Sequence, residues 1–314
     1  MASSLPLKYS PEVADALATS QPVVALESTI IAHGLPYPEN AKTAQLLEQT
    51  VRDGGAVPAT IAVLDGVATV GLSASELTHI SGPETEILKL SRRDLPFAFS
   101  QNRTGATTVA TTMLIAAAAG IRVFATGGIG GVHRGAEINF DISADLPELG
   151  RSDVAVICAG PKAILDIPAT LQYLETLGVP VIGYRCDMMP AFWSQSADLC
   201  VDYRLDSAAE IANLCTQKWQ AGLNGGVLIT NPGPQADQIN PEKIEAAIKD
   251  ALALADERSI SGKALTPFLL DQIRHITDGA SLNANKALVR NNAVLAADIS
   301  VAMSGLKPAQ GQFS

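Results

Sequence analysis

The sequence predicts an α/β fold in which helices flank a mixed, mostly parallel sheet as an α/β/α sandwich. Short apolar runs rich in Val, Ile and Ala alternate with longer segments whose apolar residues recur at helical spacing, a pattern typical of β-α units. Hydrophobic residues make up 47% of the 314-residue chain and charged residues only 17%, which excludes a disordered chain and favours a large buried core. We therefore expect a single α/β domain over residues 1–314.

Short apolar segments with β-branched residues are the predicted strands. They are Val23–Ser28, Thr60–Leu64, Ala68–Leu72, Arg122–Thr126, Val154–Cys158, Val179–Tyr184 and Gly226–Ile229. Asp65-Gly66 lies between the second and third of these segments, and such a pair suits a tight turn that needs positive φ. The second and third strands should therefore form a hairpin.

Two groups of helices are predicted. Crossover helices over Asn40–Asp53, Ala106–Ala119 and Ala163–Leu177 are each followed by a glycine, which is a common stop signal. From about residue 241 the pattern changes to three helices with no strand among them, which we interpret as a helical appendage to the same domain. These helices are Pro241–Arg258, Leu265–Thr277 and Ser281–Met303.

The overall charge argues against a protein that binds nucleic acid. The formal net charge is -10, whereas nucleic-acid binders need clustered Lys and Arg. A small anionic ligand is compatible with this charge, because a few cations and backbone N–H groups can hold a phosphate. Residues 1–20 lack an apolar segment behind a basic start, and no apolar run reaches bilayer length, so we expect a cytoplasmic protein that contacts no membrane.

Lys162 is the strongest candidate for a reactive side chain. It follows the apolar strand Val154–Cys158, and the pattern places it in the first turn of a helix that begins with Pro161. The partial positive charge of a helix N-terminus and partial burial both disfavour the ammonium form, so we expect a neutral amine that attacks a carbonyl. Two alternatives stay open from position alone: the side chain reaches solvent, or it holds a phosphate as a fixed cation.

Glu27 is the candidate acid, but its position allows two interpretations. It ends the apolar segment Val23–Leu26, where burial would raise the pKa of its carboxyl and let it donate a proton near neutral pH. A core carboxylate paired with an arginine fits the position equally well. Lys89, which is followed by Arg92 and Arg93, is also ambiguous, since a solvated charged face is the usual meaning of such a cluster.

Two loops offer phosphate-binding or metal-binding groups. Gly127–Gly131 can bring backbone N–H groups close to a phosphate, although a tight turn also explains the glycines. Asp141 and Asp145 supply the carboxylate oxygens that Mg²⁺ and Mn²⁺ prefer, while a solvated turn or an N-cap explains them equally well. The four histidines show no zinc-binding spacing and are expected to be structural.

Several motifs match one known family. They are ALESTIIAHGLP at Ala25–Pro36, TGGIGGVHR at Thr126–Arg134, DISADL at Asp141–Leu146, CAGPKAILD at Cys158–Asp166, Asn231-Pro232, and NANKALV at Asn283–Val289. Through these motifs, and from about Val24 to about Val301, the chain resembles the pseudouridine-5'-phosphate glycosidases.

The resemblance implies an activity and a set of site residues. Members of this family hydrolyse pseudouridine 5'-phosphate reversibly to uracil and ribose 5-phosphate, depend on a divalent metal such as Mn²⁺ or Mg²⁺, and are homotrimers. Lys162 matches their catalytic lysine, Glu27 their acid, and Asp141 their metal ligand, with Asp145 as the alternative ligand. Substrate-binding positions of the family match Lys89, Thr108, Val109, Thr126, His133, Ser143, Ala144, Asp145 and Asn285.

The residues and the resemblance lead to one reaction scheme. A carbon-linked base does not simply leave an unactivated sugar, whereas a neutral Lys162 can attack C1' while Glu27 protonates the ring oxygen or the base carbon. The result is an imine-linked sugar that water then releases. The alternatives are a lyase or aldolase, a sugar-phosphate-binding protein without activity, and an RNA pseudouridine synthase, the last of which conflicts with the acidic charge.

Overall fold

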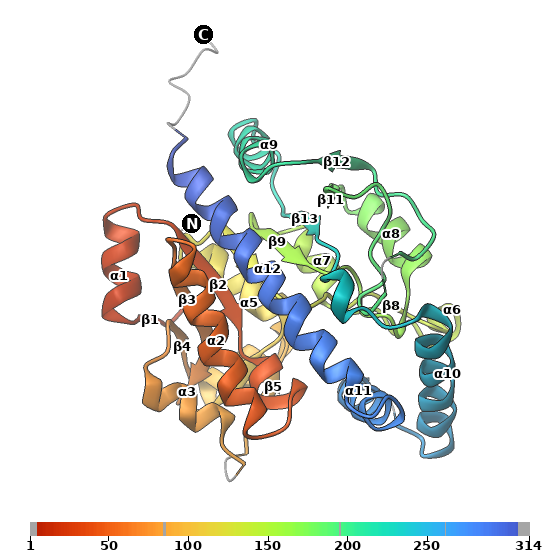
Figure 1. Ribbon diagram of the computed structural model, residues 1–314. Coiled ribbons are helices and arrows are strands. Elements are labelled where there is room, and N and C mark those ends of the chain that lie inside the picture. The colour runs from red at the N-terminus through yellow and green to blue at the C-terminus, as the bar shows by residue number, and fades with distance from the viewer. Residues whose placement is uncertain (1–4, 84–85, 195, 261, 307–314) are drawn as a thin grey trace.

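The computed structural model describes residues 5–83, 86–194, 196–260 and 262–306. Its strands form one 11-stranded sheet and one 2-stranded sheet (Figure 1). The large sheet contains β1 (Leu7–Tyr9), β2 (Val23–Glu27), β3 (Val57–Leu64), β4 (Val67–Val70), β5 (Leu88–Leu90), β6 (Gly105–Thr107), β7 (Val123–Ala125), β9 (Ala155–Cys158), β11 (Val181–Tyr184), β12 (Tyr203–Leu205) and β13 (Val227–Thr230). The small sheet pairs β8 (Val132–His133) with β10 (Leu165–Asp166).

The middle of the large sheet is parallel. Strands β3, β2, β7, β9, β13 and β11 lie side by side in that order, and each neighbouring pair is parallel. Strand β3 also pairs antiparallel with β4 and β6, and the turn between β3 and β4 holds Asp65 at φ 48° and Gly66 at φ 75°. The predicted mixed, mostly parallel sheet and its Asp-Gly hairpin are therefore confirmed.

Helices cover both faces of the large sheet (Figure 1). They are α1 (Pro11–Ala18), α2 (Glu39–Asp53), α3 (Ala74–Ser81), α4 (Leu95–Ser100), α5 (Val109–Ala118), α6 (Ala136–Asn139), α7 (Asp145–Leu149), α8 (Ile167–Thr176), α9 (Ala208–Gln220), α10 (Pro241–Glu257), α11 (Leu265–Ile276) and α12 (Ala280–Ser304). Val24 and Leu26 of β2 pack into a core with α2, α9 and α12, whereas Val23 and Ala25 pack into a second core with α1, α5 and α8. Because successive strand residues point to opposite faces, a strand covered on both sides is apolar throughout.

The last helix belongs to the core, so the prediction of a helical appendage is wrong in this respect. In Figure 1, α12 is the long blue helix that crosses the central strands, and it contacts α2, α9, β2, β7 and β9. Ala293, Ala296 and Ala297 of α12 are fully buried. Their small side chains let the helix lie close to its neighbours. At Gly54, the C-cap of α2, the approach is so close that an added Cβ would stand 2.5 Å from Ala297. Neither α12 nor any other helix in the described part of the chain is long and apolar enough to cross a bilayer.

Candidate active site

A cavity of about 760 Å³ lies at the carboxyl ends of the central parallel strands. Its wall includes Glu27 at the end of β2, the glycines that follow β7, and Lys162, which follows β9. This is the edge where open α/β sheets bind their ligands. The wall also contains the other site residues expected from the sequence, with the exception of Thr126: Lys89, Thr108, Val109, His133, Asp141, Ser143, Ala144, Asp145 and Asn285.

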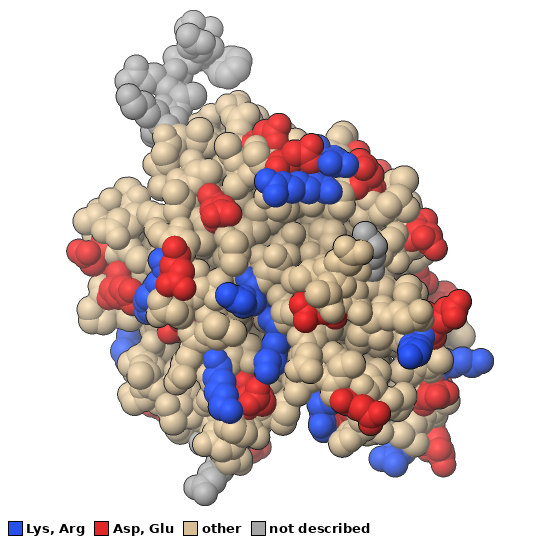
Figure 2. Space-filling view, in the orientation of Figure 1, with Lys and Arg blue, Asp and Glu red and all other residues tan. Residues whose placement is uncertain are grey.

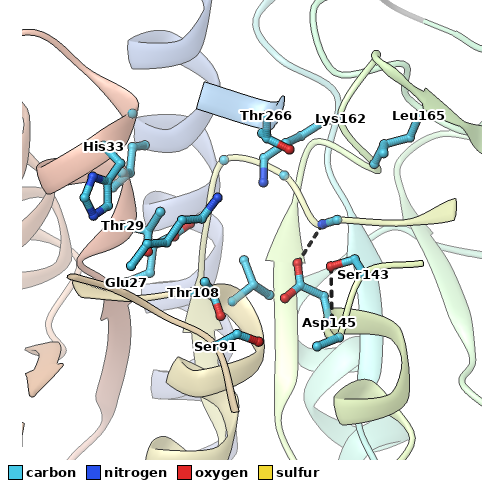
Figure 3. Close-up of a pocket in the computed structure, with 18 of the residues that line it drawn as sticks. Glu27, Thr29, His33, Ser91, Thr108, Ser143, Asp145, Lys162, Leu165 and Thr266 are labelled. Carbon is cyan, nitrogen blue, oxygen red and sulfur yellow. Dashed lines mark hydrogen bonds between the residues drawn. The ribbon is translucent and has the colours of Figure 1, made fainter. Parts of the chain in front are cut away.

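Glu27 and Lys162 form the centre of the cavity. The pKa of Glu27 is raised, chiefly by burial of its carboxyl, while the charge of Lys162 and a hydrogen bond from Thr126 act in the opposite direction. Thr126 is fully buried behind Glu27, where its Oγ1 donates a short hydrogen bond to Glu27 Oε1. The amine of Lys162 points into the cavity, on a different wall from Glu27 (Figure 3). A half-buried acid and a lysine therefore face the same cavity.

The local structure at Lys162 differs from the prediction. Lys162 lies in a loop, and α8 begins only at Ile167, with Asp166 accepting a hydrogen bond from the Ala169 N–H at 2.9 Å as its N-cap. Asp166 is a better N-cap than the residues around Pro161, and Leu165-Asp166 pairs with β8 before the helix starts. The argument from a helix N-terminus is therefore wrong for Lys162. The loop is instead fixed by the hydrogen bond from the Lys162 N–H to the Ile129 carbonyl, 3.1 Å long.

The glycines after β7 leave room in the cavity because they have no side chains, but three N–H groups of this segment are not available to a phosphate. The N–H groups of Ile129, Gly130 and Val132 already donate to Gly160 O, Asp145 Oδ2 and Thr170 Oγ1, respectively. A Cβ on Gly130 would stand 2.8 Å from Asp145 Oδ2, and a Cβ on Gly128 would stand 2.6 Å from the Phe192 ring and 2.9 Å from the Gly160 carbonyl. The prediction that this loop cradles a phosphate is wrong for those three N–H groups, because backbone and side-chain acceptors occupy them.

Gly128→Ala should destabilise the fold, because the Phe192 ring and the backbone of Gly160 must both move to admit the methyl group. We expect the free energy of unfolding to fall by about 1–3 kcal/mol, as is usual for overpacking a close-packed core. Urea unfolding measures the change. Gly82→Ala is the matched control, since its Cβ would meet nothing closer than 3.4 Å; an equal loss in both variants would contradict the steric role assigned to Gly128.

The N-terminus of α5 forms a polar end of the cavity. Thr108 is its N-cap, and the hydroxyls of Ser91, Thr108 and Ser143 gather at this end (Figure 3). Lys89 and Arg93 line the same cavity. Hydroxyls, cations and a helix N-terminus together are the groups that bind phosphate.

Asp145 stabilises this end of the cavity by accepting a hydrogen bond at each of its carboxylate oxygens. Its Oδ1 accepts from the Ala110 N–H at 2.8 Å and its Oδ2 accepts from the Gly130 N–H at 2.8 Å. The carboxylate is buried and joins the first turn of α5 to the glycine loop. A carboxylate with both oxygens bound to backbone donors is a weaker candidate for a metal ligand than Asp141.

Asp141 is half-buried in the cavity wall beside His133. The His133 N–H donates to the Asp141 carbonyl at 3.0 Å, and burial lowers the pKa of the His133 imidazole while the charge of Asp141 opposes that effect. The described residues contain no cluster of three or more His, Cys, Asp or Glu side chains that could hold a metal. One carboxylate completed by water suits Mg²⁺ or Mn²⁺, which keep several water ligands, and does not suit zinc.

His33 lines the cavity but was expected to be structural. It lies in a π-helix, Ile30–Gly34, a rare element that is frequent at functional sites. Its Nε2 atom is buried and has no hydrogen-bond partner among the described residues. The pKa of the imidazole is lowered mainly by its burial and, to a smaller extent, by the charge of Lys89. The apolar residues Phe192 and Leu288 were also missed; they line the cavity from segments far apart in the sequence.

Together, the fold and the cavity define an α/β enzyme with a half-buried acid and a lysine beside an end whose groups suit an anion. The model of the indigoidine synthase A like proteins matches residues 12–302 of the chain. A pseudouridine-5'-phosphate glycosidase from Geobacillus kaustophilus (strain HTA426) is 56% identical over 298 residues, which are 95% of this chain and 99% of the relative. Another from Escherichia coli (strain K12) is 55% identical over 293 residues, 93% of this chain and 94% of the relative.

A solved structure supports the same relationship. The prealnumycin C-glycosynthase AlnA, in complex with ribulose 5-phosphate, superposes with a TM-score of 0.88 at 41% identity and covers 96% of this chain and 98% of its own. The chain belongs to the indigoidine synthase A like family and, within it, to the pseudouridine-5'-phosphate glycosidases.

Proposed function

We propose that this protein cleaves the carbon–carbon glycosidic bond of pseudouridine 5'-phosphate to give uracil and ribose 5-phosphate, and that the reaction is reversible. The observation that carries the proposal is the placement of Lys162 and the half-buried Glu27 on one cavity whose α5 end suits a phosphate. The names of the relatives support the substrate, and the C-glycosynthase with its bound pentulose phosphate supports sugar-phosphate chemistry at a carbon–carbon bond.

The site residues divide the chemistry between them. The amine of Lys162 attacks C1' of the ribose, the bond from C1' to the ring oxygen breaks, and Glu27 supplies the proton that the ring oxygen takes up. The attacking nitrogen, now positively charged, gives a proton to the Glu27 carboxylate. Its lone pair then forms a protonated imine to C1' as the bond to the uracil carbon breaks, and Glu27 delivers the proton to that carbon. Water adds to the imine and releases ribose 5-phosphate with the free amine of Lys162. Thr126 holds the Glu27 carboxyl in place during these steps.

A divalent cation, Mn²⁺ or Mg²⁺, is part of the proposal. Asp141 would hold it, with water completing the ligands, and the ion would supply positive charge near the anionic substrate. Asp145 is the poorer ligand, because both of its oxygens accept backbone hydrogen bonds.

Asp141→Asn should weaken Mn²⁺ binding by at least about tenfold, because an amide oxygen replaces the carboxylate that attracts the ion. Titration calorimetry or the electron paramagnetic resonance signal of free Mn²⁺ measures binding without reference to activity. Glu137→Gln removes one negative charge from the exposed surface of nearby α6 and serves as the control. Equal Mn²⁺ affinity in wild type and Asp141→Asn would contradict the assignment of this ligand.

The direct test of the function is incubation of the protein with pseudouridine 5'-phosphate and Mn²⁺, with and without a chelator, followed by detection of free uracil. Uracil release separates the glycosidase from an aldolase or a binding protein, neither of which produces it. An RNA pseudouridine synthase would be retained on RNA at moderate salt. On the face shown in Figure 2, blue basic side chains alternate with red acidic ones, which does not favour that alternative.

Two properties stay predictions: the homotrimeric assembly that the family resemblance implies, and the cytoplasmic location expected from the sequence.

A further inference from the structure

We propose that Trp193 is a positioning residue: its indole N–H fixes the side-chain amide of Asn285 so that the NH₂ group faces a carbonyl oxygen of the nucleobase. This inference rests on the proposed function and goes beyond it, because it assigns how the site distinguishes the base of its substrate.

The hydrogen bond between the two side chains sets the direction of the amide. Trp193 Nε1 lies 2.7 Å from Asn285 Oδ1, and an indole nitrogen can only donate. The amide oxygen must therefore face the indole, which directs Nδ2 away from it. No hydrogen bond from Nδ2 to another described residue is found, although Asn285 is half-buried in the cavity wall. Asn285 therefore offers unused N–H donors to a ligand.

Packing holds the indole in place. Trp193 is 1% exposed, and its ring meets the Phe192 ring edge to face, with centroids 5.0 Å apart and planes at 61°. Phe192 is itself buried and lines the cavity. A fixed indole gives Asn285 one amide orientation, whereas a solvated amide could present either its oxygen or its NH₂ group.

The two ends of the glycine loop have different neighbours. At the Gly127 end the neighbours are Leu288 and Phe192, while at the Gly130 end the neighbours are Ser143 and Asp145. The first end is apolar and suits the flat face of a base, and the second end suits the phosphate. Asn285 lies on α12, as does Leu288, and so belongs with the apolar end. A few well-placed polar groups in an apolar pocket fix the orientation of a ligand, and Asn285 is one such group here.

This arrangement predicts that the site discriminates against a base with an amino group where uracil has a carbonyl oxygen. Uracil presents carbonyl oxygens, which accept from the NH₂ group of Asn285. If an amino group replaced that oxygen, two N–H donors would face each other, one from the base and one from Asn285. A site strongly rejects a ligand that leaves its buried donors unpaired. Without the indole N–H the amide can turn over and accept from that amino group, so the discrimination should weaken.

The test compares Trp193→Phe with the wild type on pseudouridine 5'-phosphate and on two analogues, each with an amino group in place of one base carbonyl oxygen. We expect the wild type to prefer the natural substrate over at least one analogue by about 10²-fold in kcat/KM, and Trp193→Phe to reduce that ratio about tenfold. Trp219→Phe is the matched control, since Trp219 is the other of the chain's two tryptophans and donates at 2.9 Å to the Gly225 carbonyl, outside the cavity wall. Its ratio should equal that of the wild type.

Asn285→Asp gives a second test that does not depend on how well Trp193→Phe folds. The carboxylate of this variant would still accept from the indole but would present oxygen to the base, so kcat/KM for the natural substrate should fall about 10²-fold while the analogue loses less. An unchanged ratio in both Trp193→Phe and Asn285→Asp would overturn the inference. Failure of the wild type to release uracil would instead overturn the proposed function itself.

Discussion

Lys162→Ala should reduce uracil release by at least about 10³-fold while the fold stays intact, because the variant lacks the amine that attacks C1'. Lys162 lies in a loop that its own backbone N–H ties to Ile129, so loss of the side chain leaves this hydrogen bond in place. Steady-state kinetics and circular dichroism give the two readouts. Borohydride added with substrate to the wild type should leave a ribosyl phosphate mass on the peptide that contains Lys162.

Two variants separate a nucleophile from a phosphate-binding cation. Lys162→Arg keeps a positive charge but not the amine, and it should be nearly as inactive as Lys162→Ala. Lys89→Ala should mainly raise KM, since Lys89 lines the polar end of the cavity. A borohydride-trapped mass on another peptide, or a Lys162→Arg variant with near-normal kcat, would contradict the assignment of Lys162.

The central fold could be predicted because its strands are buried on both faces. An apolar strand such as β9, with Ala155 and Ile157 in one core and Val156 and Cys158 in the other, shows clearly in the sequence. The edges of the sheet could not be predicted in this way. Strands β1, β5, β6 and β12 have only three residues each, which is too short for a periodic pattern. The core position of α12 was missed because its alanines do not reveal what packs on them.

The candidate site was predictable where residues follow strand ends and where motifs match a family. Glu27 and the glycine loop are examples, since Glu27 ends the strand β2 and the glycine loop follows β7. Trp193 and His33 could not be recognised in the same way, because their roles depend on contacts with Asn285 and with the cavity, which sequence spacing does not show. The predicted helix start near Lys162 is wrong because a proline suits the first turn of a helix but does not fix where the helix begins, and here Asp166 is the N-cap.

Glu27→Gln should lower kcat by about 10²–10⁴-fold, since the amide cannot donate a proton as the carboxylic acid does. The substitution nearly preserves shape, and the Gln oxygen can still accept the hydrogen bond from Thr126. Because burial raises the pKa of Glu27, the wild type should keep its acid form to a higher pH than an exposed glutamate, and activity should fall as the pH rises through this raised pKa. A pH–rate profile measures the fall.

The same raised pKa predicts that Glu27→Gln is more stable than the wild type at neutral pH. The folded protein holds the Glu27 proton more tightly than the unfolded chain, whose glutamate pKa is about 4.3. The stabilising contribution is therefore fully present below that value and is lost as the pH rises through the folded-state pKa. Gln does not titrate, so the Tm of Glu27→Gln should exceed that of the wild type at pH 7, and the gap should narrow toward pH 4. A Tm difference between the two proteins that stays the same from pH 4 to pH 7 would show that the folded state does not raise the pKa of Glu27, and would contradict its assignment as an acid near neutral pH.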